Sequence, residues 1–289
     1  MGISVIQSII DGILMGGVYA LAALGVSLIF GVMKITNFAH GALITVGMYM
    51  TYEVCTMLGV NPYIILPIVI LAMFVIGFIM QRYLMNLIIN APGHNQLLLT
   101  LGMSIVIHNL ILLIFSANPR TVIVSGFEKA IRIGSFTINK PKLTAFVIVV
   151  VVAVLIYFVL YKTDMGKAIR ATSMQREGAT LMGINVKNVN ATAFGIGIAC
   201  AGLAGALLTP IQYMSPTSGD TYQLTCFVIA VFGGLGNIGG AIAAGLIIGV
   251  VQSLASFILG GSWSDMIIYL IFVLTLLLKP TGLFGKKGG

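Results

Sequence analysis

Residues 143–161 read LTAFVIVVVVAVLIYFVLY, a run of nineteen residues without one charged side chain. A helix of about 20 apolar residues spans the hydrocarbon core of a bilayer. The whole chain shares this character, because 59% of its 289 residues are hydrophobic and only 8% are charged, whereas about 25% are charged in a soluble domain. This composition predicts an all-α, polytopic bundle of transmembrane helices. It excludes a soluble enzyme and a secreted, fibrous or disordered chain.

Nine apolar segments are candidates for membrane-crossing helices. None alternates with period 2, which excludes a transmembrane β-barrel. Glycine and proline interrupt the backbone beside the first and seventh segments, where half-helices are an alternative, so the predicted number of crossings is eight to ten. The segments lie at 9–32, 38–57, 62–82, 95–117, 141–161, 188–213, 222–235, 238–258 and 264–279.

The basic residues predict the orientation. With nine crossings and a cytoplasmic C-terminus, ten Lys and Arg residues face the cytoplasm and five face outward, in agreement with the positive-inside rule. The net charge of +8 follows from this topology, so no nucleic-acid partner is expected. The expected cytoplasmic residues are Lys34, Arg82, Lys162, Lys167, Arg170, Arg176, Lys187, Lys279, Lys286 and Lys287, and the outer ones are Arg120, Lys129, Arg132, Lys140 and Lys142.

Two connecting loops are long enough to carry structure of their own. Residues 118–140 mix β-branched and aromatic residues in short runs, which predicts an extracytoplasmic hairpin. Residues 162–187 intersperse basic and apolar side chains, a pattern typical of one or two short amphipathic helices on the cytoplasmic face. A solvated basic loop held at anionic headgroups is the alternative for this second loop.

Glycine and alanine recur at four-residue spacing, which lets membrane helices approach closely. The expected contact rows are Gly197, Ala201 and Gly205; Ala241, Gly245 and Gly249; and Gly236 with Gly240. The run GGLGNIGG at 233–240 is denser than packing requires and predicts a break that exposes backbone groups to a cavity. The pattern Phe-Gly followed by Gly-Ala occurs at 30–42 and again at 232–241, which suggests a two-half repeat.

No motif for catalysis or nucleotide binding is found in the chain. A phosphate-cradling loop ending in Gly-Lys-Ser/Thr is absent, as are HExxH and GxSxG. The three histidines are scattered, and the three cysteines, each inside an apolar stretch, form no CxxC pair. We therefore expect no catalytic residue, no metal and no cofactor, and buried reduced thiols at Cys55, Cys200 and Cys226. Any energy for work comes from a partner or an ion gradient.

Polar residues within apolar segments often face a transport pathway. Asn37, His40 and Asn237 lie beside glycine-rich breaks, where a pathway and a structural hydrogen bond are equally open. Structural interhelical bonds are favoured for His108, Asn109 and Gln252. Asp11 and Glu53 are expected to be the only intramembrane carboxylates, both near the outer boundary.

Three stretches resemble the permease subunit of branched-chain amino acid ABC importers, with a match from about residue 12 to 285. The first runs from Gly17-Val18-Tyr19-Ala20-Leu21 through Leu28-Ile29-Phe30-Gly31 to Asn37-Phe38-Ala39-His40-Gly41. The second is Met165-Gly166-Lys167-Ala168-Ile169-Arg170-Ala171, continued by Leu181-Met182-Gly183-Ile184-Asn185. The third joins 232–241 to Lys279-Pro280-Thr281-Gly282-Leu283-Phe284-Gly285. The chain is similar in length to the shorter of the two permease types.

The resemblance implies a working assembly in the bacterial cytoplasmic (inner) membrane. Such a permease pairs with a homologous second permease, two cytoplasmic ATPase subunits and an extracytoplasmic substrate-binding protein. A cytoplasmic loop with an EAAxxxG-like pattern docks into the ATPase, and Glu177-Gly178-Ala179 followed by Gly183 matches it with one Ala replaced by Gly. The implied coupling residues are Gly166, Lys167, Arg170, Glu177, Ala179 and Gly183, and the expected pathway residues are Asn37, His40, Gly41, Gly236 and Asn237.

The family pattern also differs from this chain at several positions. Acidic residues are common in the family where this chain has Ala42, Gln81 and Gln252, and a frequent Ser-x-Pro is Asn237-Ile238-Gly239 here. These departures bear on the prediction of which substrate is transported more than on the prediction of the helical architecture. We expect residues 1–289 to form one permease domain that moves branched-chain or related amino acids by alternating access. Urea or short amides are the alternative substrates, and a self-sufficient secondary carrier or channel is the alternative class.

Overall fold

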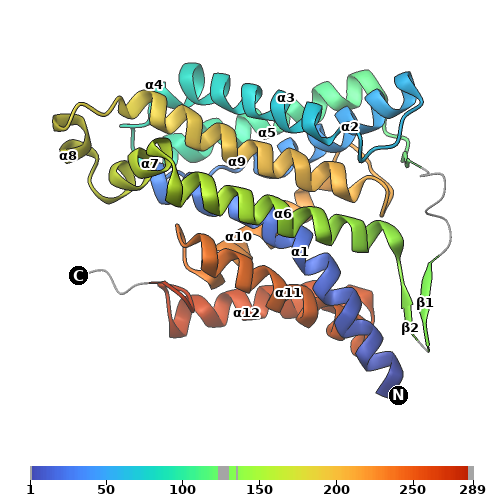
Figure 1. The fold of residues 1–289 in the computed structure, drawn as a ribbon. Helices are drawn as coiled ribbons and strands as arrows, with labels where there is room; N and C mark the ends of the chain where they lie inside the picture. Colours follow the sequence, from blue (N-terminus) through green and yellow to red (C-terminus); the bar gives the residue numbers. More distant parts are fainter. Residues whose placement is uncertain (1, 123–129, 135, 286–289) are drawn as a thin grey trace.

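The computed structural model describes residues 2–122, 130–134 and 136–285. These residues form a bundle of helices with one small hairpin (Figure 1). The long helices are α1 (Gly2–Met33), α2 (His40–Leu58), α3 (Leu66–Met80), α5 (Gly93–Phe115), α6 (Lys140–Lys162), α9 (Val186–Leu208), α10 (Ser218–Gly233), α11 (Ile238–Leu259) and α12 (Gly261–Leu278). The short elements are the π-helical turn η1 (Gln81–Met85), α4 (Asn86–Ile88), α7 (Asp164–Met174), α8 (Arg176–Leu181), β1 (Ile131–Ile133) and β2 (Phe136–Ile138).

All nine predicted apolar segments are helical, which confirms a polytopic helical membrane protein. Six of the described helical segments are long and apolar enough to cross a membrane: α1, the continuous segment Leu66–Ile88, α5, α6, α9 and α11. The first segment is one uninterrupted helix, so a half-helix there was a wrong alternative. The chain breaks instead at residues 34–39, between α1 and α2.

Helices α1 and α9 form the centre of the bundle. In their most apolar stretches 83% and 89% of the residues are buried, against 17% in α5 and 22% in α6. The sequence of the central helices allows this, because small residues bring backbones together. A Cβ added to Gly16 would lie 2.8 Å from the Gly245 carbonyl oxygen, and Gly249 also packs on Gly16.

Two of the three predicted small-residue rows are confirmed as helix contacts. Gly245 and Gly249 face α1, while Gly197 and Gly205 face α1 and α2 respectively. The pair of Gly236 with Gly240 was wrong, because Gly236 precedes α11 in a turn with a φ of +86°. The three cysteines are buried and free, as expected for reduced thiols.

The hairpin and the helices α7 and α8, the described structure of the two long loops, lie at opposite ends of the bundle (Figure 1). One end carries the N-terminus and the antiparallel hairpin, in which Ile131 pairs with Ile138. The hairpin is fixed to α1 by two hydrogen bonds between Thr137 and the Gln7 side chain, of 2.7 and 3.0 Å. Helices α7 and α8 and the C-terminal segment lie at the other end. Lys129, Lys286 and Lys287 lie outside the described residues.

Candidate functional site

The break at residues 34–39 lies inside the bundle, and α2 begins there. The His40 ring Nε2 is 3.0 Å from the Ala22 carbonyl oxygen. Ala22 precedes the end of α1 at Met33 by eleven residues, or about 16 Å at 1.5 Å per residue. Ile35, Asn37 and Ala39 are buried. The first turn of α2 is therefore at membrane depth.

Gln223 of α10 holds this buried break together. Its side-chain oxygen accepts from the Gly41 backbone N–H at 2.6 Å, and its amide nitrogen donates to the Asn37 carbonyl at 3.3 Å. The Asn37 side chain in turn accepts from the Ala39 N–H at 3.0 Å. The structure thus brings together three of the residues predicted for the pathway, which are Asn37, His40 and Gly41. It also adds Gln223, a partner that the sequence analysis missed. Among the described residues, Asn37 Nδ2 and His40 Nδ1 are buried without a hydrogen-bond partner.

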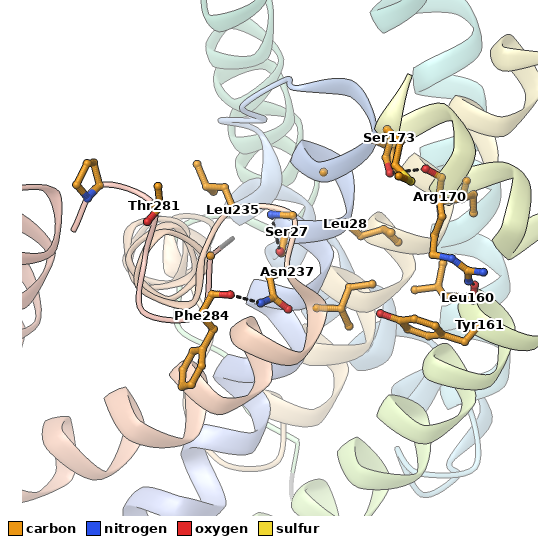
Figure 2. A pocket seen from close by; sticks show the side chains of 18 residues that line it. Ser27, Leu28, Leu160, Tyr161, Arg170, Ser173, Leu235, Asn237, Thr281 and Phe284 are labelled. Atoms are coloured by element: carbon orange, nitrogen blue, oxygen red, sulfur yellow. Dashed lines mark hydrogen bonds between the residues drawn. The ribbon is translucent and has the colours of Figure 1, made fainter. Parts of the chain in front are cut away.

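The second break, residues 234–237, lies at the end of the bundle that carries α7 and α8. Its Gly236 N–H donates to the Ser27 hydroxyl at 3.1 Å. Asn237 is the N-cap of α11, because its side-chain oxygen accepts from the Gly240 N–H at 3.0 Å. Its amide nitrogen donates to the Phe284 carbonyl at 2.7 Å (Figure 2). The structure therefore places Gly236 and Asn237 apart from the Asn37 group.

A cavity of about 570 Å³ opens beside this second break. Figure 2 shows that the labelled side chains come from four places in the chain. The walls are the last turns of α1, the α6–α7 junction, the break itself and residues 280–285. Arg170 and Asn237, predicted for different roles, both line this cavity. The cavity therefore separates α7 from the α10–α11 turn.

The residues expected to couple to an ATPase divide into two groups. Gly166 and Arg170 face α6: Gly166 packs against the Val159 and Leu160 carbonyls, and Arg170 donates to Leu160 and lies 4.9 Å from the Tyr161 ring. These two residues form the turn between α6 and α7. Ala179 is also buried.

The second group is exposed at the end of the bundle. Lys167 and Glu177 point away from it, and Gly183 follows α8 with a φ of +80°. Lys167 pairs with Asp164 at 2.9 Å, and this hydrogen bond lowers the pKa of the Asp164 carboxyl. The prediction of one or two short helices in this loop is confirmed by α7 and α8.

Large apolar side chains are exposed on α7 and α8. Met174, Leu181 and Met182 are 87%, 88% and 83% exposed. These helices lie at the end of the bundle rather than along it (Figure 1). Isolated exposed hydrophobic residues are ordinary, but a group of three on adjoining short helices is typical of a protein contact surface.

The remaining polar residues correct one expectation. Asp11 accepts from Gln7, which bonds the β1–β2 hairpin, and pairs with Lys142 at 3.0 Å. Two further carboxylates, Asp220 and Asp265, lie near the starts of α10 and α12. Asp220 lies 3.4 Å from His108, and Asp265 accepts from Gln252 at 3.3 Å. Asn109 bonds within α5, to Ile105 at 2.8 Å, so the interhelical bond expected for it was wrong.

Nothing in the described part of the chain groups three His, Cys, Asp or Glu residues as a metal site would. The site consists of two breaks between helices, a buried group of hydrogen-bonded residues around Asn37 and Gln223, a cavity at one end of the bundle and an exposed apolar surface beside that cavity. These features are typical of a membrane transport subunit, whose binding sites lie where helices are discontinuous.

Comparison with known proteins agrees with this geometry. The family model "Branched-chain amino acid transport system / permease component" matches residues 8–276. The chain is 29% identical to the high-affinity branched-chain amino acid transport system permease protein BraD of Pseudomonas aeruginosa, over 97% of this chain and 96% of that one. It is 30% identical to LivH of Escherichia coli K12, over 97% and 96%.

A third relative comes from an archaeon. The probable branched-chain amino acid transport permease protein LivH of Methanocaldococcus jannaschii is 28% identical over 96% of this chain and 92% of its own length. No solved structure matches the chain. The family match covers nearly the whole bundle. The chain therefore belongs to the family of permease components of branched-chain amino acid transport systems.

Proposed function

We propose that this chain is the membrane subunit of an ATP-driven importer for branched-chain or related amino acids in the bacterial cytoplasmic membrane. The observation that carries the proposal is similarity along nearly the full length to permeases whose names specify branched-chain amino acids. Residues 1–289 act as one permease domain beside a homologous second permease. Two cytoplasmic ATPase subunits supply the energy, and an extracytoplasmic binding protein delivers the substrate.

The test is reconstitution in vesicles. The chain, its second permease, both ATPases and the binding protein should together take up labelled leucine only when ATP is supplied on the ATPase side. Uptake by this chain alone would make it a self-sufficient carrier or channel. ATP-dependent uptake of urea or a short amide, with no uptake of leucine, would keep the transporter class and replace the substrate.

We propose that the ATPase docks on the exposed surface of α7 and α8. Met174, Leu181 and Met182 support this, because large apolar side chains outside the membrane lower their free energy when a partner covers them. Leu181→Asp should abolish co-purification of the ATPases without lowering the melting temperature of the chain. The control is Thr180→Asp, on the same exposed helix. Because the Thr180 side chain has less apolar surface than Leu181, this change should leave the assembly intact. Full assembly of Leu181→Asp would contradict the docking surface.

We propose that the pathway passes the buried break at Asn37, His40 and Gly41. The support is the pair of unpartnered buried nitrogens at Asn37 and His40, which a passing polar solute can bond. Gly236 and Asn237 belong to the inner end of the same route. Gly236→Leu should block uptake while the complex stays assembled, because a side chain there meets the α1 backbone at Gly31, 3.0 Å away. Wild-type uptake would remove Gly236 from the route.

We propose that residues 118–140 are extracytoplasmic and form part of the surface for the binding protein. Ser125 lies outside the described residues, so Thr121, which is exposed, is the better reporter. With the native cysteines removed, Thr121→Cys should react with an impermeant thiol reagent in intact spheroplasts. Leu181→Cys, at the opposite end, should react only after the membrane is opened. The reverse pattern would invert the topology.

A further inference from the structure

A polar stripe runs along one face of α5. Gln96, Thr100, Ser104 and His108 follow one another at four-residue spacing, so they share a face. Gln96 donates to the carbonyls of residues 88, 89 and 91, and Thr100 donates to Leu97. These bonds join α5 to itself and to the preceding loop. Bonding to another long helix therefore does not explain Gln96 and Thr100.

Asp220 lies opposite the end of this stripe. Its Oδ1 is 3.4 Å from His108 Nε2, and its side chain is 58% exposed. The preceding residue, Gly219, packs against Gly41 at the start of α2 and donates to the Thr45 hydroxyl at 2.9 Å. Asp220 is therefore at the depth of the buried break. An exposed carboxylate at that depth needs water, a solute or a partner rather than lipid.

The side chain of His108 also has capacity for a further ligand. Its Nε2 is buried and makes no hydrogen bond among the described residues, although it lies within ion-pair distance of Asp220. Thr217 and Thr221, on the same side of α10 as Asp220, are exposed. The first turns of α10 thus expose a carboxylate and two hydroxyl groups.

A small cavity also lies between α5 and α10, farther from His108 and Asp220. A cavity of about 290 Å³ is lined by Gln96 and Leu97 of α5, Phe227 of α10 and Thr36 and Phe38 of the buried break. Its remaining walls are Lys34 and Gly93. Since α5 runs opposite to α10, this cavity lies toward the inner end and the His108–Asp220 pair toward the outer end. Both lie between α5 and α10.

We propose that the gap between α5 and α10 is the substrate route, and that Asp220 binds the ammonium group of the amino acid in it. This rests on the proposed function. The carboxylate is the one charged side chain on the exposed stripe of α10 among described residues, and an ammonium group offers it a charge-assisted hydrogen bond. The exposed hydroxyls of Thr217 and Thr221 can bond the substrate carboxylate. Urea and amides carry no such cation, so this site selects amino acids.

The first experiment probes the gap chemically, in the complete complex with the native cysteines removed. Thr221→Cys should react with water-soluble methanethiosulfonates, and the cationic reagent should react about tenfold faster than the anionic one because of the neighbouring carboxylate. Asp220→Asn should bring the two rates together, and leucine should slow both. The control is Ile105→Cys, on the exposed apolar face of α5, which should not react. Failure of Thr221→Cys to react would overturn the route.

The second experiment measures transport by the same complex. Asp220→Asn should lower leucine uptake about tenfold or more, the expected effect of losing one charge-assisted hydrogen bond. Asp220→Glu should restore part of it. The matched control is Asp265→Asn, which removes a carboxylate near the start of α12 bonded to Gln252 and should leave the charge preference at Thr221→Cys unchanged.

The outcomes separate this inference from the proposed function. If the wild-type complex takes up leucine and Asp220→Asn does so equally well, the ammonium site is wrong and the importer stands. If Asp220→Asn separates the two permeases, Asp220 is an assembly contact and the inference falls. If leucine is not transported although the cationic reagent is still preferred, the proposed substrate is wrong and the route between α5 and α10 remains.

Discussion

The two breaks in the bundle have similar sequences and different surroundings. Each follows a Phe-Gly pair and precedes a Gly-Ala pair. The break at 34–39 is buried at Ile35, Asn37 and Ala39, and its backbone and that of the first turn of α2 bond to Gln223 of α10 and to the Asn37 side chain. The break at 234–237 is partly exposed, and the C-terminal segment contacts it through Asn237 and Phe284.

The difference shows that the partner helix, rather than the local sequence, determines how deep a break lies. The first break is buried because Gly219 lets α10 approach Gly41. The second stays at the end of the bundle because α10 and α11 meet in a four-residue turn, with Gly233 against Gly240. Substitutions in the two breaks should therefore differ in cost, and four predictions test this.

Gly41→Leu should have the largest effect. A Cβ at Gly41 would lie 2.7 Å from Gln223 Cβ and also against the Gly219 backbone. The two backbones cannot move apart without separating α2 from α10. We therefore expect the free energy of unfolding to fall by more than about 3 kcal/mol. The measurement is the yield of folded chain in fluorescence-detected size exclusion. A wild-type yield would show that the buried break tolerates displacement.

Gln223→Leu should come second. It leaves the Gly41 N–H buried without a partner, which lowers the free energy of unfolding by roughly 1–3 kcal/mol, and leaves the Asn37 carbonyl with only the longer bond from the His40 N–H, of 3.4 Å. The thermal unfolding midpoint in detergent should fall clearly. Thr221→Val, two residues away and exposed, is the control and should leave the midpoint unchanged. Equal midpoints for the two variants would remove Gln223 as the residue that holds the break.

Asn237→Ala should lower the free energy of unfolding by less, about 1 kcal/mol, because it removes one helix cap at a partly exposed site. It also removes the hydrogen bond to the Phe284 carbonyl, so cleavage by chymotrypsin after Phe284 should become faster. Asn237→Ser keeps the cap but loses the amide that donates to Phe284. That variant should show faster cleavage with an unchanged midpoint. If both variants are cleaved at the wild-type rate, Asn237 does not hold the C-terminal segment.

Gly239→Ala should have the smallest effect. A Cβ there meets only the Asn237 side chain, at 3.7 Å. Alanine restricts the unfolded chain more than glycine, so the change should be neutral or stabilise by up to about 1 kcal/mol. A destabilised variant would show that the second break is as tightly packed as the first, and the contrast between them would fail.

The helices could be predicted from the sequence because uninterrupted apolar runs specify them directly. The run at 143–161 became α6, and the alternation of basic and apolar residues after it became α7 and α8. The hairpin at β1 and β2 followed from short runs of β-branched and aromatic residues in the loop at 118–140. Each of these signals is local, and a local signal needs no knowledge of the partner helix.

The site residues were harder, because tertiary contacts determine them. Asp220 sits in Thr217-Ser218-Gly219-Asp220, which reads as a loop before a crossing expected at 222. Gly219 places it at depth by packing on residue 41, nearly 180 residues away. The stripe from Gln96 to His108 was visible as four-residue spacing and could have been found. The sequence could not show that Asn237 caps α11 and bonds Phe284, because both contacts depend on how the chain folds back, and its place on the pathway stays a prediction.

The contact between α1 and α11 has a mechanical consequence. Gly12 and Gly16 meet Gly245 and Gly249 with almost no side chain between the two backbones, so neither helix can rotate or slide alone. The pair must move as one stiff body throughout a transport cycle. The lightly buried α5, with 17% of its apolar stretch covered, has few contacts to break. Within the described chain, α5 is therefore held to its neighbours far more loosely than the α1–α11 pair is held together.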